Sequence, residues 1–198
     1  PPGILEGSDM HLLKTVVFAG GLTATLLGVG LKPLNARDLG LTPNQVYNIW
    51  TNINKALLVF AKQQSRFATF QPQFNSLKVS KFSNKKPIDV LARVEEFSKK
   101  FHAFTGRKDF LPGEGLLTKE VVFQHRENNA VVTPSVVYLS SANLLVKFVS
   151  EIEKQIGPND LISPFFANRE FSAKEPSDVF GLVDLADRRM DLLIKGLR

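Results

Sequence analysis

The chain contains no cysteine, one tryptophan and two tyrosines among its 198 residues. The absence of cysteine excludes disulfide bonds, thiolate nucleophiles and cysteine-ligated zinc, and it slightly favours an exported bacterial protein, since exposed thiols are a hazard in an oxidising compartment. The charge excess is small: 25 Lys and Arg against 19 Asp and Glu give a net charge of +6. Because no RRM, KH or zinc-finger pattern accompanies this excess, the sequence argues against nucleic acid as a partner.

The sequence also lacks the motifs of catalysis and cofactor binding. The three histidines, His11, His102 and His125, are far apart and form no zinc-binding pattern. Gly28-Val29-Gly30 lacks the third glycine of a dinucleotide fingerprint, and neither a Walker motif nor a Gly-x-Ser-x-Gly elbow is present. We therefore expect a protein that is not an enzyme and that binds no metal and no cofactor.

Phenylalanine, by contrast, is abundant, with 16 residues. A phenylalanine ring brings a large apolar area without a polar group. This composition predicts either a large aromatic core or an apolar surface for a partner.

A short pattern occurs four times. Each of four prolines is followed three residues later by valine and then by a large apolar residue, and the prolines are 44, 47 and 42 residues apart: Pro43, Pro87, Pro134 and Pro176. Self-similarity at such a period is typical of a repeated supersecondary unit. The sequence thus predicts an internal repeat of about 42–47 residues.

Each proline also heads an apolar stripe. Of the twenty positions that lie 3, 7, 10, 14 and 17 residues after the four prolines, eighteen are apolar, which predicts four helices of about 18–20 residues. The exceptions, Ser141 and Glu151, suggest that the third helix buries a rotated or broader face with Leu139, Val146, Val149 and Ile152. Proline suits the first turn of a helix, Thr42 and Thr133 can cap the free amides, and Gly106 and Gly157 are expected stops. The predicted fold is mainly α: a four-helix bundle over residues 41–198.

The connections between these helices are unusually long, at about 20, 27 and 18 residues. All three contain phenylalanine, and the phenylalanines of the first and third either fold back over the bundle or form a surface for a partner. The partner-contact candidates are Phe70, Phe74, Phe82, Phe165, Phe166 and Phe171. The second connection contains a strand–turn–strand pattern over residues 119–132, which predicts a small β-hairpin. Because long connections permit either helix direction, the topology stays open.

Residues 1–40 form a separate apolar amino-terminal segment. Residues 15–31 include no charged side chain, and Lys14 precedes them. We expect a hairpin around Gly20-Gly21 or a tail buried in protein. A membrane-associated segment and a retained export signal are the less favoured alternatives.

These observations leave two main functional hypotheses. The first is a structural or interaction protein in a larger bacterial cell-envelope assembly, on its periplasmic side, which docks onto other protein subunits through the Phe-rich connections and residues 15–31. The second is a carrier of an apolar ligand or lipid in a Phe-lined bundle. The lysine run Lys78, Lys81, Lys85 and Lys86 could bind an anionic surface, although such runs are more often solvated faces. The bacterial assignment rests on the Asn, Lys, Gln and Phe bias, and a cytoplasmic location is the alternative.

Overall fold

A computed structural model describes residues 39–106, 131–156 and 163–197. These residues are mainly helical, and no β-strand occurs among them. The predicted hairpin over 119–132 lies outside the described residues except for its last two positions, and the apolar segment 15–31 lies entirely outside them.

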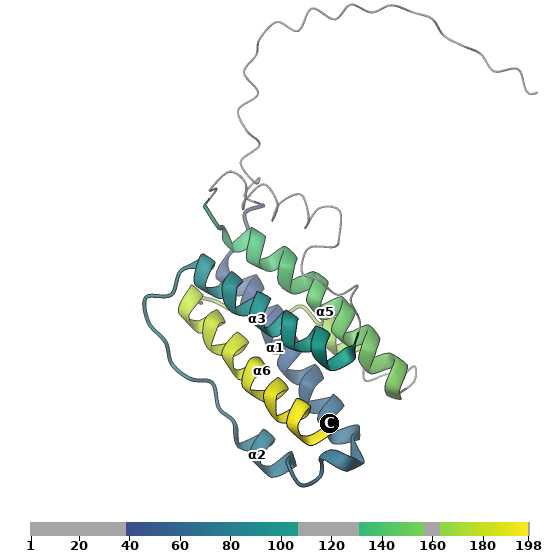
Figure 1. Cartoon of the computed structure of the whole chain (residues 1–198). Helices are drawn as coiled ribbons and strands as arrows, with labels where there is room; N and C mark the ends of the chain where they lie inside the picture. Colours follow the sequence, from purple (N-terminus) through teal and green to yellow (C-terminus); the bar gives the residue numbers. More distant parts are fainter. Residues whose placement is uncertain (1–38, 107–130, 157–162, 198) are drawn as a thin grey trace, which may run out of the picture. The chain divides into compact units, whose positions relative to one another are not determined.

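Four long helices pack together (Figure 1): α1 (Pro43–Gln63), α3 (Pro87–Thr105), α5 (Pro134–Ile156) and α6 (Pro176–Leu197). Three short helices lie in the connections: η1 (Ser65–Phe67), α2 (Gln71–Ser76) and η2 (Ser163–Phe166). The long helices contain 19 to 23 residues, so the predicted lengths are slightly short. Each begins at one of the four prolines, as the sequence predicts.

The helix ends are stabilised largely by local hydrogen bonds. At α1, the Thr42 hydroxyl accepts from the backbone N–H of Asn44, which confirms that cap. At α3 and α6, Asp89 and Asp178 accept from the backbone N–H of the residue before the proline, over 2.8 and 2.9 Å. Gly106 ends α3 at a φ of 69°. The predicted cap by Thr133 is wrong, because its hydroxyl has no hydrogen-bond partner in the described part of the chain.

All four long helices run in the same direction. Side chains at matching distances from the prolines touch: Trp50 and Ser141 are each seven residues along their helices, and Phe101 and Phe148 are each fourteen. At the starting end, the four prolines and the four valines that follow them line one shallow apolar depression. Figure 1 accordingly shows every long helix starting at the upper left. The bundle is therefore parallel, which the sequence left undecided.

This direction explains the long connections. Antiparallel neighbours can be joined by a few residues, whereas a parallel helix requires the chain to travel back about 30 Å, the length of a 20-residue helix. Residues 77–86 make this return along the outer side of α6 (Figure 1). There, Arg188 donates to the backbone oxygen of Lys78, and the N–H of Lys85 donates to the hydroxyl of Ser177.

Gly181 of α6 allows the close approach of this returning segment. A Cβ atom at Gly181 would lie 2.7 Å from the backbone oxygen of Ser80, which is nearer than a carbon atom can come. We call residues 77–86 the first strap. The first strap therefore requires glycine at position 181, whereas helix α6 alone does not.

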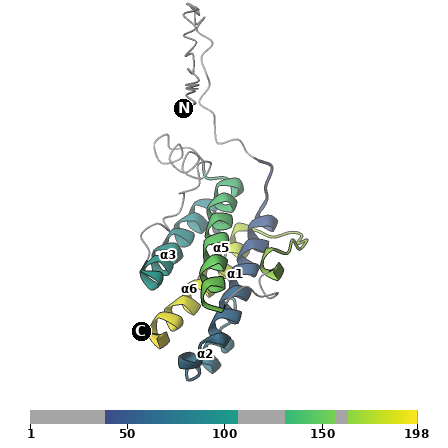
Figure 2. The same ribbon diagram turned by 90° about the vertical axis from the view of Figure 1, so that its right-hand side faces the viewer.

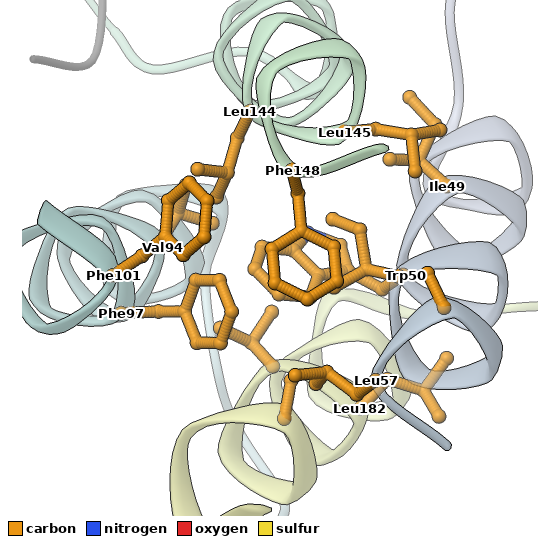
Figure 3. Close-up of a cluster of buried hydrophobic side chains, with 14 of the residues drawn as sticks. Ile49, Trp50, Leu57, Val94, Phe97, Phe101, Leu144, Leu145, Phe148 and Leu182 are labelled. Atoms are coloured by element: carbon orange, nitrogen blue, oxygen red, sulfur yellow. The ribbon is translucent and has the colours of Figure 1, made fainter. Parts of the chain in front are cut away.

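The helices form a four-membered ring in the order α1, α5, α3, α6. Helices α1 and α3 face each other across the core, as do α5 and α6, and their side chains fill the space between them (Figure 3). Trp50 meets Phe97 edge-on, with ring centroids 5.3 Å apart, and Phe101 meets Phe148 at 4.9 Å. The core is therefore aromatic, as the abundance of phenylalanine predicts.

Ser141 belongs to this core and lies in the broader buried face of α5 that was one of the two predicted alternatives. Its side chain is fully buried, and its hydroxyl accepts a hydrogen bond of 2.9 Å from the indole Nε1 of Trp50. A small residue on α5 makes room for the largest residue on α1. Val149 and Ile152 are buried as predicted, but Val146 is 55% exposed.

Candidate docking groove

Most of the predicted partner-contact residues pack against other parts of this chain. Five of the six phenylalanines lie against this chain's own helices: Phe70, Phe74, Phe82, Phe165 and Phe171. Phe74 and Phe165 are buried in the core. Only Phe166, in η2, is largely exposed, at 51%. Of the six predicted partner-contact residues, Phe166 is therefore the one that remains exposed to a partner.

The predicted lysine run lies within the first strap. Lys78, Lys81 and Lys86 are exposed. Lys85 is half-buried, and its ammonium group lies 4.6 Å from the ring centroid of Phe180 in a cation–π contact. Three of the four lysines are thus free to face an anionic surface, while Lys85 also anchors the strap.

A second strap, residues 167–175, crosses the outer side of α1 (Figure 2). Three asparagines spaced four residues apart hold its backbone. Asn48 and Asn52 both donate to the backbone oxygen of Ala167, over 3.3 and 3.0 Å, and Asn44 accepts from the N–H of Lys174 over 2.9 Å. This row of amides converts one face of α1 into a binding site for an extended backbone.

Between this strap and α5 lies a groove of about 420 Å³. We call it the α1/α5 groove, and its lining residues are Gln45, Asn48, Ile49, Asn52, Tyr138, Ala142, Leu145, Val146, Phe166 and Asn168. None of these ten residues is charged. Two of its residues, Val146 and Phe166, are largely exposed apolar side chains. Its composition is typical of a site for an apolar side chain flanked by hydrogen-bonding groups.

Asn52 gives this groove an unused acceptor. The residue is only 2% exposed, and its amide nitrogen is held by Ala167, yet its Oδ1 atom has no hydrogen-bond partner among the described residues. Leaving a buried acceptor unpaired costs roughly 1–3 kcal/mol. The groove thus borders a buried acceptor that the described chain leaves unpaired.

Comparison with known proteins gives no independent guide to this groove. The chain matches no protein-family model, no curated protein and no solved structure. Its function is therefore argued from its own residues.

One helix is apolar enough to raise the question of a membrane. The stretch Pro134–Lys154 of α5 has the length and mean hydropathy of a membrane span, and 56% of its most apolar window is buried inside the protein. Because α5 supplies Ser141, Leu144 and Phe148 to the core, packing in the bundle accounts for its apolar character.

Several charged side chains cluster between α3 and α6. Asp187 is buried there and accepts from Lys100 over 2.7 Å and from Arg93 over 3.0 Å. Burial lowers the pKa of Lys100, but hydrogen bonds and charges from Asp187 and Asp191 outweigh burial and raise the pKa above its ordinary value. These groups are paired with one another, so they fasten the two helices together.

Arg189 is the most deeply buried cation of the described chain and has no carboxylate partner there. It donates to Oδ1 of Asn54 over 2.9 Å and lies 5.4 Å from the ring centroid of Phe74. Burial, and to a smaller extent the charge of Arg188, lowers the pKa of Arg189 to about 10. The contact ties α6 to α1 and α2. No three metal-ligating side chains come together within the described ranges.

Two sequence signals for the groove and the straps were available. Asn44, Asn48 and Asn52 recur every four residues, which places them on one face of a helix. Residues 82–87 and 171–176 share the pattern Phe-Ser-x-Lys-x-Pro, and they are the ends of the two straps. The third position of this pattern has a positive φ in both, 59° at Asn84 and 52° at Ala173. Gly40, also three residues before a proline, has a φ of 68°.

Proposed function

We propose that this protein is a non-enzymatic interaction protein that binds another protein through the α1/α5 groove. The observation that carries the proposal is the combination of two exposed apolar side chains, Val146 and Phe166, with the buried, unpaired Oδ1 of Asn52 in one uncharged groove. Exposed apolar groups that adjoin each other usually mark an interaction site.

The alternative function, a carrier of an apolar ligand inside the bundle, is less well supported. Trp50, Phe97, Phe101 and Phe148 occupy the interior and are almost fully buried (Figure 3). An enclosed ligand would have to displace these rings, which a close-packed core resists. We therefore favour binding at the surface.

Two further parts of the proposal rest on the sequence. We place the protein in a bacterial cell-envelope assembly, on the periplasmic side, where residues 15–31 would supply a second contact to protein or membrane. We also propose that the four long helices are copies of one ancestral unit. The four proline–valine starts at one end of the bundle and the two Phe-Ser-x-Lys-x-Pro straps support this second proposal.

Site-specific photocrosslinking of the full chain in its source cells tests the groove. We expect a photoreactive phenylalanine in place of Phe166 to give one discrete protein adduct, because this side chain lies at the edge of the groove. The charge introduced by Val146→Glu should abolish the adduct. Ile88 of α3 is 47% exposed and outside the groove, so Ile88→Glu is the matched control and should leave the adduct unchanged.

The proposal would be contradicted by an adduct that Val146→Glu and Ile88→Glu weaken equally, or by diffuse labelling at position 166 that resembles labelling at position 88. Thermal unfolding of both variants accompanies the experiment. Because both side chains are exposed in the isolated chain, their melting temperatures should agree within a few degrees.

A further inference from the structure

The two straps bind their helices by the same set of contacts. On α1, the ring of Phe171 packs edge-on against Tyr47 at 4.9 Å, and the ammonium group of Lys174 lies 4.8 Å from the Tyr47 ring centroid. On α6, Phe82 packs edge-on against Phe180 at 4.8 Å, and Lys85 lies over the same ring. In each case the ring is four residues after the proline, and phenylalanine precedes lysine by three positions.

The second residue of each of these helices completes the site. The side-chain oxygens of Asn44 and Ser177 accept from the backbone N–H groups of the same two lysines, Lys174 and Lys85, over 2.9 and 3.0 Å. A strap is therefore recognised by one backbone hydrogen bond, one aromatic pair and one cation–π contact, all within the first turns of a helix.

Helix α5 carries the same acceptor and the same ring. Ser135 is its second residue and accepts from the N–H of Leu39 over 3.1 Å, and Tyr138 follows the proline by four residues. At this hydrogen bond Leu39 takes the place that lysine has in the two straps. Among the described residues, the Tyr138 ring has neither an aromatic nor a cationic partner. Its side chain instead lines the α1/α5 groove.

We propose that the α1/α5 groove binds an extended segment of a partner protein in which phenylalanine precedes lysine by three residues. This inference rests on the proposed function and names the chemistry of its partner. The phenylalanine packs against Tyr138, and the lysine ammonium group lies over the same ring. The groove is continuous with the second strap, since Asn48 and Asn52 contact the strap backbone and also line the groove.

The probe is a fluorescein-labelled peptide with the sequence of residues 169–175, which contains Phe171 and Lys174, titrated with the full chain and followed by fluorescence anisotropy. Losing the aromatic and the cation–π contact together should weaken binding about tenfold. We expect this tenfold loss for Tyr138→Leu, because leucine makes neither contact. Peptides with Phe171→Ala or Lys174→Glu should also bind at least several-fold more weakly.

Two controls separate this site from others. The peptide could instead displace the second strap from α1, in which case Tyr47→Leu would weaken binding and Tyr138→Leu would not; this result would overturn the proposal. Ile88→Glu should leave the affinity unchanged. A concentration-dependent dimer that Val146→Glu abolishes and the peptide does not compete with would assign the groove to a second copy of the chain and would equally overturn it.

The two experiments together distinguish a failure of this inference from a failure of the proposed function. If the adduct at position 166 forms and is sensitive to Val146→Glu, but no peptide binds saturably, then the groove binds a protein of different chemistry and only this inference fails. If neither adduct nor peptide binding is observed, both fail.

Discussion

Replacing Trp50 with alanine is expected to lower the free energy of unfolding by ~3–5 kcal/mol, the range found for large aromatic residues in a close-packed core. Trp50 is fully buried and packs on Phe97 from the facing helix. The substitution opens a cavity between the four helices and also leaves the hydroxyl of Ser141 without its donor. Urea unfolding measures the loss.

Ser141 allows the hydrogen bond to be separated from the cavity. Ser141→Ala keeps the volume nearly constant but leaves the indole N–H buried and unpaired, which should cost about 1–3 kcal/mol. In the Trp50→Phe background the same change should cost much less, because no donor remains. Lys62→Ala, on the exposed side of α1, is the control and should stay within about 0.5 kcal/mol of the parent protein. Equal effects of Ser141→Ala in both backgrounds would contradict the assigned bond.

The second large effect is expected at Asp187. Asp187→Ala should destabilise the protein by about 2–4 kcal/mol, because a buried carboxylate that accepts from Lys100 and Arg93 is lost. A double-mutant cycle with Lys100→Met isolates the pair and should give a coupling of roughly 1–3 kcal/mol. A coupling near zero would show that the two groups do not interact. Lys99→Met, on the exposed side of the same helix, is the matched control and should show no coupling.

The same pair predicts a pH dependence. Folding raises the pKa of Lys100 above its ordinary value of 10.5. The stabilisation from this group is therefore fully present below about pH 10 and is lost as the pH rises through the higher folded value. Lys100→Met should remove this part of the alkaline dependence, whereas Lys99→Met should retain it.

The sequence predicted the helices well because their signals are local. Proline starts a helix by its own geometry, and the heptad spacing that contains Val46, Trp50 and Ile53 is visible without any knowledge of neighbours. The predicted alternatives for α5 included a broader buried face, but the burial of Ser141 within it was not foreseen, for a non-local reason. Whether a serine can lie in a core depends on a donor supplied by another helix, here Trp50.

The direction of the helices could have been inferred from the lengths of the connections. Periodicity carries no information about direction, since a stripe reads the same for parallel and antiparallel neighbours. Connections of about 20 residues or more between helices of this length, however, match a chain that returns to the starting end each time. Of the two alternatives for the phenylalanines in these connections, packing on the chain itself holds for five of the six partner-contact candidates.

The groove was harder to foresee. Val146 was placed in the core by its spacing, but it lies on the exposed side of α5. Asn48 and Asn52 carry no functional signature on their own, because asparagine on a helix is usually solvated. Only the position of the second strap across α1 brings their amides, Phe166 and Tyr138 around one space.

The parallel bundle is the central claim, because both straps and the groove depend on it. The chain has no cysteine, so pairs of cysteines introduced for spin labels are unique. Lys62 lies in the last turn of α1, Ala103 near the end of α3 and Ile88 at its start, and all three are exposed.

Pulsed electron–electron double resonance on two doubly labelled chains measures the direction. With a rise of 1.5 Å per residue, parallel helices place the Lys62–Ile88 pair about 15 Å farther apart than the Lys62–Ala103 pair. We therefore predict that the Lys62–Ile88 distance is the longer of the two. A longer distance for Lys62–Ala103 would show that α1 and α3 are antiparallel and would contradict the account.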